Sequence, residues 1–160
     1  MLSRRLARRM ALQILFANEF LREDIHSVAE RVAESLNEQI TPFTFDLLNK
    51  TVDKEDELND LIRQHLRNWD YKRVAVLDRV LIRMALCEIV YFPDIPVEVT
   101  INEALEISKD FSNLKSRRFV NGILDSIYKE LKSANRLSKN NHLAIALNHK
   151  QKTHSKGSPP

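Results

Sequence analysis

Four arginines near the amino end, followed by an aromatic residue, have side chains suited to binding a polyanion. Arg4, Arg5, Arg8 and Arg9 precede Phe16, and no acidic residue lies among them. A guanidinium can hold a phosphate through two parallel hydrogen bonds, and an exposed aromatic ring offers a face on which an unpaired base can stack. This combination predicts binding to single-stranded RNA.

Helical spacing decides which of these side chains share a face. At about 100° per residue, one side of a helix over residues 4–20 gathers Arg5, Arg8, Arg9, Leu12, Gln13 and Phe16. The opposite side is apolar, with Ala7, Met10, Ala11, Ile14 and Leu15. Periodicity leaves an alternative open, in which Leu12 and Phe16 pack against another helix. The arginines would then only keep that face solvated, since arginine stems often cover apolar surface.

A second basic cluster, Lys115, Arg117 and Arg118, begins the last predicted helix. Cations at a helix amino terminus oppose the macrodipole, so a bound anion explains them better than folding does. Phe119 falls outside the apolar stripe of that helix, and Gly122 follows on the same side. A glycine in mid-helix costs about 1 kcal/mol relative to alanine. Close packing of another helix is the commoner reason for such a glycine, and close approach of a ligand is the alternative.

Residues for catalysis or metal binding are not arranged in any recognisable pattern. The five histidines lack metal-ligand spacing with one another or with Cys87, the single cysteine. Cys87 is expected to be a small buried or half-buried apolar residue rather than a nucleophile, and no pair of carboxylates is marked for acid–base work. The charged run 78–83 can form local ion pairs on a solvated face, and by itself it indicates no function. We therefore expect a binding protein with no enzymatic activity, no cofactor and no metal.

The elements that position these residues are predicted to be helices in a single all-α domain. Two glycines in 160 residues and 43% apolar content favour helices over a sheet with many turns. Apolar spacing predicts helices over 4–20, 25–37, 42–67 with a bend at 53–57, from a cap at 70 to about 91, from about 100 onward, and 116–131. Expected amino-terminal caps are Ser3, Asp24, Thr41 and Asp70. Thr100 and Glu103 have the spacing of a capping box that opens the fifth helix.

Charge is segregated along the chain. Residues 1–18 carry +4 and residues 133–160 carry +5; since the whole chain carries +3, residues 19–132 carry −6. This pattern suits a protein that meets a polyanion at one place and a basic partner at another. We expect residues 1–132 to form the helical domain and residues 133–160 to be a basic, mostly disordered tail. A single cysteine, no apolar run of about 18 residues and no signal peptide predict a cytoplasmic protein without membrane contact.

Four blocks in order resemble the family of the transcription antitermination factor NusB: RRLARRMALQILF, LDRVLIRMALCEI, PVEVTINEALEISKDF and SRRFVNGILD. The resemblance implies a fold of two small helical bundles packed into one domain. It also implies an RNA-binding factor that recognises single-stranded boxA RNA together with the ribosomal protein NusE. Such a factor supports the RNA polymerase antitermination complex on ribosomal RNA operons.

Matching the motifs residue by residue transfers the expected sites. The expected RNA-binding residues, with the basic neighbours found from spacing, are Arg4, Arg5, Arg8, Arg9, Gln13, Phe16, Lys115, Arg117, Arg118, Phe119 and Gly122. Phe16 stands where tyrosine is common in the family, which keeps a stacking face and loses a hydroxyl. Glu88 and Asp125 are the acidic positions expected to contact NusE.

Other arrangements remain open at this point. Some members of the family form homodimers through the arginine-bearing face, which would cover the RNA site. The chain could also be a protein-only scaffold. A third alternative is a relative of the NusB-like domain found at the front of ribosomal RNA cytosine methyltransferases. That enzyme requires a catalytic domain after the NusB-like domain, and 160 residues do not accommodate one.

Overall fold

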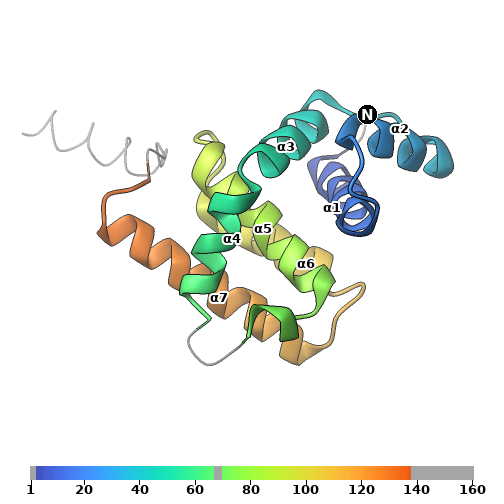
Figure 1. Cartoon of the computed structure of the whole chain (residues 1–160). Helices are drawn as coiled ribbons and strands as arrows, with labels where there is room; N and C mark the ends of the chain where they lie inside the picture. Colours follow the sequence, from blue (N-terminus) through green and yellow to red (C-terminus); the bar gives the residue numbers. More distant parts are fainter. Residues whose placement is uncertain (1–2, 67–69, 138–160) are drawn as a thin grey trace, which may run out of the picture.

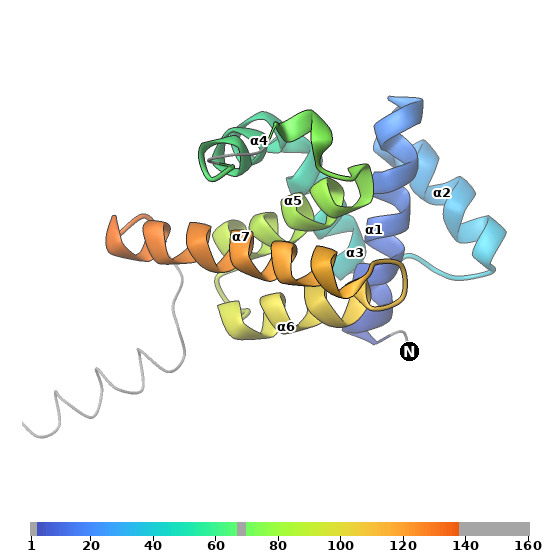
Figure 2. The same ribbon diagram turned by 90° about the horizontal axis from the view of Figure 1, so that it is seen from below.

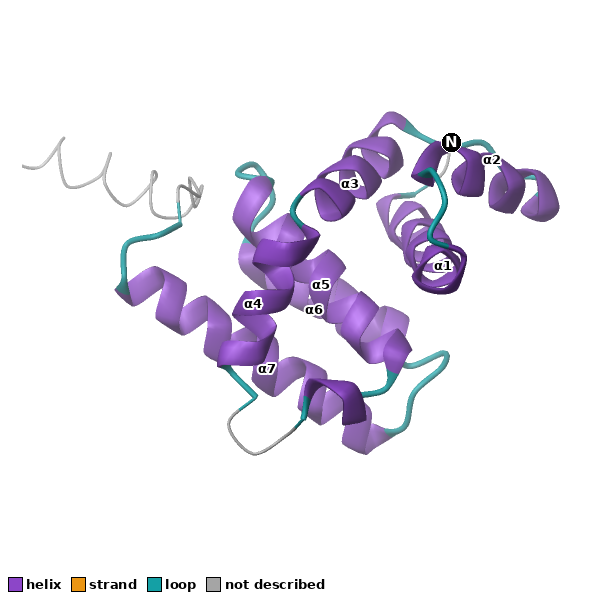
Figure 3. Cartoon of the chain, viewed as in Figure 1, coloured by secondary structure: helices purple, strands orange, loops and turns teal. Residues whose placement is uncertain are grey.

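The computed structural model describes residues 3–66 and 70–137, and the regular elements of that part are all helices (Figure 1; Figure 3). In chain order they are α1 (Arg4–Leu21), α2 (Ile25–Leu36), α3 (Pro42–Asp53), α4 (Glu55–Gln64), the 3-10 turn η1 (Tyr71–Arg73), α5 (Val76–Tyr91), α6 (Val97–Ser108) and α7 (Leu114–Ser133). No strand occurs in these described ranges, so the all-helical prediction is confirmed.

Helix α5 is the centre of the molecule. It packs against α1, α3, α4, α6 and α7, while α1, α2 and α3 pack on one another and α6 packs on α7 (Figure 2). Two small bundles, α1–α3 and α4–α7, are thereby joined through α5. Their buried residues form one continuous hydrophobic core.

The sequence of α5 explains its central place. Every residue from Val80 to Ile89 is buried, as expected for a helix that is apolar around most of its circumference. Arg83 and Glu88 are charged residues within this buried stretch. Each must therefore be paired, because an isolated charge in a protein interior is very costly.

Several helices begin where short polar side chains predicted that they would. Ser3 accepts a hydrogen bond from the Leu6 amide at 3.2 Å, and Asp24 does the same for Ser27 at 3.2 Å. Thr41 accepts from the Thr44 amide at 3.2 Å, with proline at the first helical position. These side chains satisfy amides that have no partner inside the helix. The predicted caps at Ser3, Asp24 and Thr41 are confirmed.

Two predicted helices are divided more sharply than expected. The helix predicted over 42–67 is interrupted at Lys54, which separates α3 from α4 near the expected bend. Asp70 caps only the short turn η1, accepting from the Lys72 amide at 3.1 Å, and α5 starts later at Val76. The predicted cap at Asp70 is therefore confirmed, but the prediction that it opens the long helix ending near Tyr91 is wrong.

The capping box predicted at Thr100 is wrong as well. Helix α6 begins at Val97 after Pro96, so Thr100 lies inside it and its amide bonds to the Pro96 carbonyl at 3.2 Å. The Thr100 hydroxyl instead donates to the buried Glu88 carboxylate at 2.8 Å. The buried Glu88 carboxylate requires hydrogen-bond donors, whereas the amides inside α6 already have backbone partners. The Thr100 hydroxyl is therefore better used by Glu88 than by a cap. Glu103 is thereby left free for a different contact.

Among the described residues, no helix is both long and apolar enough to cross a membrane. The predicted tail from Ser133 onward lies largely outside the described residues, which end at Leu137.

Candidate nucleic-acid interface

One face of α1 carries a continuous row of basic, amide and aromatic side chains. Arg5, Arg9, Gln13, Phe16 and Phe20 follow one another at spacings of three or four residues, which places them on one side of a helix. We call this row the α1 stripe. Phe20 is 67% exposed, Phe16 is half-buried, and the other three side chains are exposed. The stripe therefore presents both cations and rings to solvent.

The two phenylalanines of the α1 stripe contact each other edge to face. The ring centroids of Phe16 and Phe20 lie 5.3 Å apart, with an angle of 80° between the ring planes. This geometry is favourable for aromatic pairs. It fixes Phe16 while leaving most of Phe20 uncovered. Phe20 follows Phe16 at helical spacing, and the sequence predicted no role for it.

Arg8 does not belong to the exposed face where it was expected. Its side chain is 4% exposed and donates to Glu88 from Nε at 2.9 Å and from Nη2 at 2.6 Å. The Glu88 side chain is itself 1% exposed. The structure therefore corrects two expectations: Arg8 presents no exposed donor to RNA, and Glu88 presents no exposed carboxylate to a protein partner. Their pairing instead fastens α1 to α5.

The correction at Arg8 has a simple geometric reason. On a helical projection Arg8 lies about 20° from the buried Leu15, at the edge of the apolar arc. Arg9 lies 100° further round and is exposed. Leu12, expected on the arginine face, is also buried. A partner on α5, 80 residues away in sequence, decides which arginine turns inward.

Arg4 lies to one side of the α1 stripe. It is exposed, and its guanidinium sits 4.8 Å from the centre of the Phe43 ring on α3. The same ring lies 5.3 Å from the Arg8 guanidinium. Such cation–π contacts orient an arginine without neutralising its charge. Arg4 therefore remains able to bind a phosphate.

The start of α7 supplies a second exposed basic surface. Asn113 caps the helix by accepting from the Ser116 amide at 2.8 Å. Four residues at helical spacing then share one side, away from the buried Val120 and Leu124: Lys115, Arg118, Phe119 and Gly122. Lys115 and Arg118 are exposed, and Phe119 is half-buried. We call these four residues the α7 start.

Gly122 and Arg117 differ from expectation in detail. A side chain at Gly122 would meet no atom of the described part of the chain within 4 Å of its Cβ. Close packing of another helix, the commoner of the two expected reasons for this glycine, is therefore wrong. The residue is exposed, and space is open above it. Arg117 is half-buried and lies away from the side that the α7 start presents. Its Nε is buried and has no hydrogen-bond acceptor among the described residues.

Two ion pairs bring the α1 stripe beside α6 and the α6–α7 connection. Arg5 donates to Glu103 from Nε at 2.8 Å and from Nη2 at 2.9 Å. Arg9 pairs with Asp110, which follows α6 in the chain. Figure 2 shows this connection beside α1. The connection that leads from α6 into the α7 start therefore lies beside the α1 stripe. It exposes Phe111 and Leu114, two residues for which the sequence predicted no role.

Hollows lie next to both surfaces. One of about 230 Å³ is bordered by Leu6, Arg9, Met10, Gln13, Leu36 and Glu38. Another of about 370 Å³ lies between η1, the start of α5 and the start of α7, bordered by residues that include Asp78, Lys115 and Phe119. Asp78 is buried, and burial raises the pKa of its carboxyl although a hydrogen bond with Ser116 opposes this shift.

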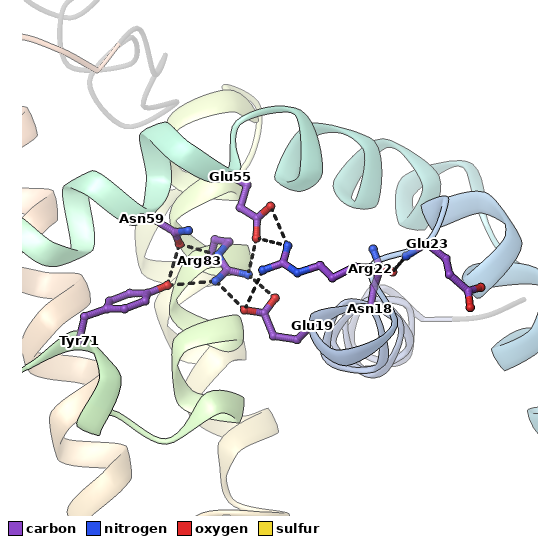
Figure 4. A network of polar contacts seen from close by, with 8 residues as sticks. All are labelled: Asn18, Glu19, Arg22, Glu23, Glu55, Asn59, Tyr71 and Arg83. Carbon is purple, nitrogen blue, oxygen red and sulfur yellow. Dashed lines mark hydrogen bonds and ion pairs between the residues drawn. The ribbon is translucent and has the colours of Figure 1, made fainter.

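The buried Arg83 is the hub of a part-buried polar network between the two bundles (Figure 4). It donates to Glu19 at 3.1 and 3.2 Å, to Asn59 at 2.8 Å and to the Tyr71 hydroxyl at 3.1 Å. Burial alone would raise the pKa of Glu19, but the hydrogen bonds and charge of Arg83 outweigh it and hold that pKa below its ordinary value. The charged run 78–83 does not lie wholly on a solvated face, because Asp78 and Arg83 are buried. Through the hydrogen bonds of Arg83 with Glu19, the network holds α1 against α5.

Neither a metal site nor a reactive thiol appears in the described part of the chain. It holds no group of three or more histidine, cysteine or acidic side chains placed to bind a metal ion. Cys87 is fully buried, and burial raises the pKa of its thiol to about 12.

Asp125, the other acidic residue expected to meet a partner, is half-buried and pairs with Lys129 at 2.9 Å.

Comparisons with known proteins agree with this architecture. The model of the NusB family matches residues 5–129. The chain is similar to the transcription antitermination protein NusB of Bacillus pumilus, with 41% identity over 132 residues that cover 82% of this chain and 98% of that protein. It is similar to the structure of T. maritima NusB, with 34% identity, a TM-score of 0.71, and coverage of 81% of this chain and 92% of that one.

A structure of the antitermination factors NusB and NusE in complex with dsRNA shares the fold, with a TM-score of 0.73 at 22% identity. It covers 79% of this chain and 96% of the matched chain. Because the family model spans most of the chain and the B. pumilus relative matches over nearly its whole length, this chain belongs to the NusB family of transcription antitermination proteins.

Proposed function

We propose that this protein binds single-stranded boxA RNA together with the ribosomal protein NusE, and so supports the RNA polymerase antitermination complex on ribosomal RNA operons. The observation that carries the proposal is the ion pair of Arg9 with Asp110, which brings the connection that leads into α7 beside the α1 stripe. We take the exposed cations and aromatic rings of the α1 stripe and the α7 start as one RNA-binding surface.

The chemistry of this surface suits an unpaired strand. Arg5, Arg9, Lys115 and Arg118 supply the charges that position phosphates. Phe16, Phe20 and Phe119 supply ring faces, and stacking contributes about 1–3 kcal/mol per base. Gly122 leaves room for a close approach of the sugar–phosphate backbone. Duplex RNA hides its base faces, so the exposed rings favour a single strand.

A basic protein partner is supported by the charge of the middle of the chain. Residues 19–132 carry −6, and electrostatic complementarity favours a basic partner. The similar structure that contains NusB and NusE supports NusE as this partner. Asp125 remains a candidate contact, whereas Glu88 acts indirectly by holding α1 in place through Arg8.

One observation favours a second candidate, a scaffold that binds only proteins. Arg5 and Arg9 are already paired with Glu103 and Asp110, as solvated structural arginines would be. A scaffold of this kind would bind NusE and have no affinity for RNA. The two candidates therefore differ in a directly measurable quantity.

The test is a titration of labelled boxA RNA and a scrambled control, with and without NusE, over a series of salt concentrations. If the four basic residues each meet a phosphate, log affinity falls against log salt with a slope of about −2.8, from about −0.7 per phosphate on a single strand. The variant Arg9→Gln should bind more weakly. Arg31→Gln, at an exposed arginine of α2 outside both surfaces, is the matched control. A slope near zero, with equal binding of both RNAs, would refute RNA recognition and leave the scaffold.

A further inference from the structure

Two arginines of the α1 stripe are bound by carboxylates of the same chain. Arg5 forms two hydrogen bonds with Glu103 on α6, and these side chains are 52% and 18% exposed. Arg9 pairs with Asp110, and these side chains are 44% and 49% exposed. The cations that face solvent on α1 are therefore partly neutralised by α6 and the residues just after it.

The carboxylates occupy donors that a phosphate would use. Glu103 engages the Nε–H and Nη2–H edge of Arg5 through both of its oxygens. A phosphate binds a guanidinium in the same forked manner, because its oxygens have a similar spacing. Asp110 engages Nη2 of Arg9. Carboxylate and phosphate therefore compete at both arginines, and each carboxylate also repels the approaching backbone.

Exposure makes this competition reversible. Ion pairs between partly exposed side chains are weak, because water and salt screen them. An RNA strand can therefore displace Glu103 and Asp110 at small cost. The buried pair of Arg8 and Glu88 is different, since neither side chain can be reached by a ligand.

We infer that Glu103 and Asp110 are internal competitors of RNA phosphates, which lower the sequence-independent affinity of the α1 stripe. This inference rests on the proposed function, in which the α1 stripe meets the RNA backbone. Phosphate contacts carry no sequence information, so the competitors weaken every RNA alike. An RNA that also stacks its bases, or that is held by NusE, overcomes the competition, whereas other RNAs bind too weakly to persist.

The test compares Glu103→Gln and Asp110→Asn with wild type and with Glu98→Gln. Glu98 is exposed on α6 and takes part in neither ion pair, so its variant controls for the loss of one negative charge. Affinities for boxA RNA and for scrambled single-stranded RNA are measured by fluorescence anisotropy. Each test variant should bind both RNAs about two- to five-fold more tightly, the range expected from the strength of an exposed ion pair. Glu98→Gln should change both affinities by less.

A second background separates competition from a general effect of charge. In the Arg5→Gln background there is no guanidinium at this position for Glu103 and a phosphate to share. Adding Glu103→Gln there should therefore give a smaller gain in RNA affinity than in the wild-type background, because only the relief of charge repulsion remains. A full gain in that background would overturn the inference. Weaker binding by Glu103→Gln in the wild-type background would also overturn it, because the carboxylate would then be orienting Arg5 for RNA.

The outcomes also distinguish this inference from the proposed function. A wild-type chain that binds boxA selectively, with variants that match Glu98→Gln, would retain the function and refute the competition. A wild-type chain without RNA affinity would refute the function. In that case, RNA binding gained by the two variants would support the competition, and no gain would refute it too.

Discussion

Replacement of Arg8 should separate the stability of the domain from its binding to RNA. The Arg8 side chain is 4% exposed and donates three hydrogen bonds to the buried Glu88 carboxylate. Removal of one partner of a buried ion pair costs about 3–5 kcal/mol, because the remaining charge stays in the interior. Domains have total stabilities of about 5–15 kcal/mol, so Arg8→Met should lose a large share.

The neighbouring arginine provides the matched control. Arg9 and Asp110 are about half exposed, and an exposed pair contributes about 0.2–1 kcal/mol. Urea unfolding followed by circular dichroism should therefore show a large loss for Arg8→Met and a small one for Arg9→Met. RNA affinity, corrected for the folded fraction, should show the reverse order. The double variant Arg8→Met/Glu88→Leu should recover much of the lost stability, because it leaves no charge unpaired.

A specific result would refute this reasoning. If the free energy of unfolding of Arg8→Met lies within about 1 kcal/mol of the wild-type value, the ion pair of Arg8 with Glu88 is not buried in solution. If it also weakens RNA binding as much as Arg9→Met does, Arg8 is an exposed ligand of RNA. The original expectation from the arginine-rich start would then be correct.

Three further predictions follow from buried and exposed groups. Phe20→Ala should leave the unfolding free energy nearly unchanged and weaken RNA binding by about 1–3 kcal/mol, since the ring is 67% exposed; RNA titration with unchanged affinity would contradict stacking there. The thiol of Cys87, with its pKa raised to about 12 by burial, should resist a thiol reagent at neutral pH until urea unfolds the domain; rapid labelling of the folded protein would contradict its burial. The pKa of Glu19 is lowered in the folded state, so its contribution to stability is present above its ordinary value of 4.5 and is lost as pH falls through the lower folded value. Urea unfolding between about pH 3 and pH 6 should show a smaller decline for Glu19→Gln than for wild type, and equal declines would contradict the role of Arg83.

Local features of this fold were predictable because their causes lie within a few residues. Ser3, Asp24 and Thr41 cap helices through amides three residues ahead, so spacing alone identified them. The apolar periodicity of α2 and α7 likewise depends only on the helical repeat. The resemblance to the NusB family rested on motifs in order along the chain, and the family match over residues 5–129 confirms it.

Features set by distant partners were not predictable from the same signals. Arg8 and Arg9 are adjacent, yet only a carboxylate 80 residues away from Arg8 turns that arginine inward. Thr100 and Glu103 have the spacing of a capping box, but Pro96 starts the helix earlier and each side chain finds a tertiary partner. The open surface at Gly122 also depends on which helices pack beside α7. The misses at Arg8 and Gly122 concern which face of a helix meets the core, and the miss at Thr100 concerns where the helix begins.

The RNA-binding surface itself can be mapped most directly by NMR. Backbone amide shifts of the labelled protein would be followed as boxA RNA is added in the presence of NusE, and compared with NusE alone. The α1 stripe and the α7 start should show the RNA-dependent changes, with Arg9, Gln13, Lys115 and Gly122 among them. Changes confined to the acidic helices α3 and α4, or no RNA-dependent change, would contradict the assignment of this surface to RNA.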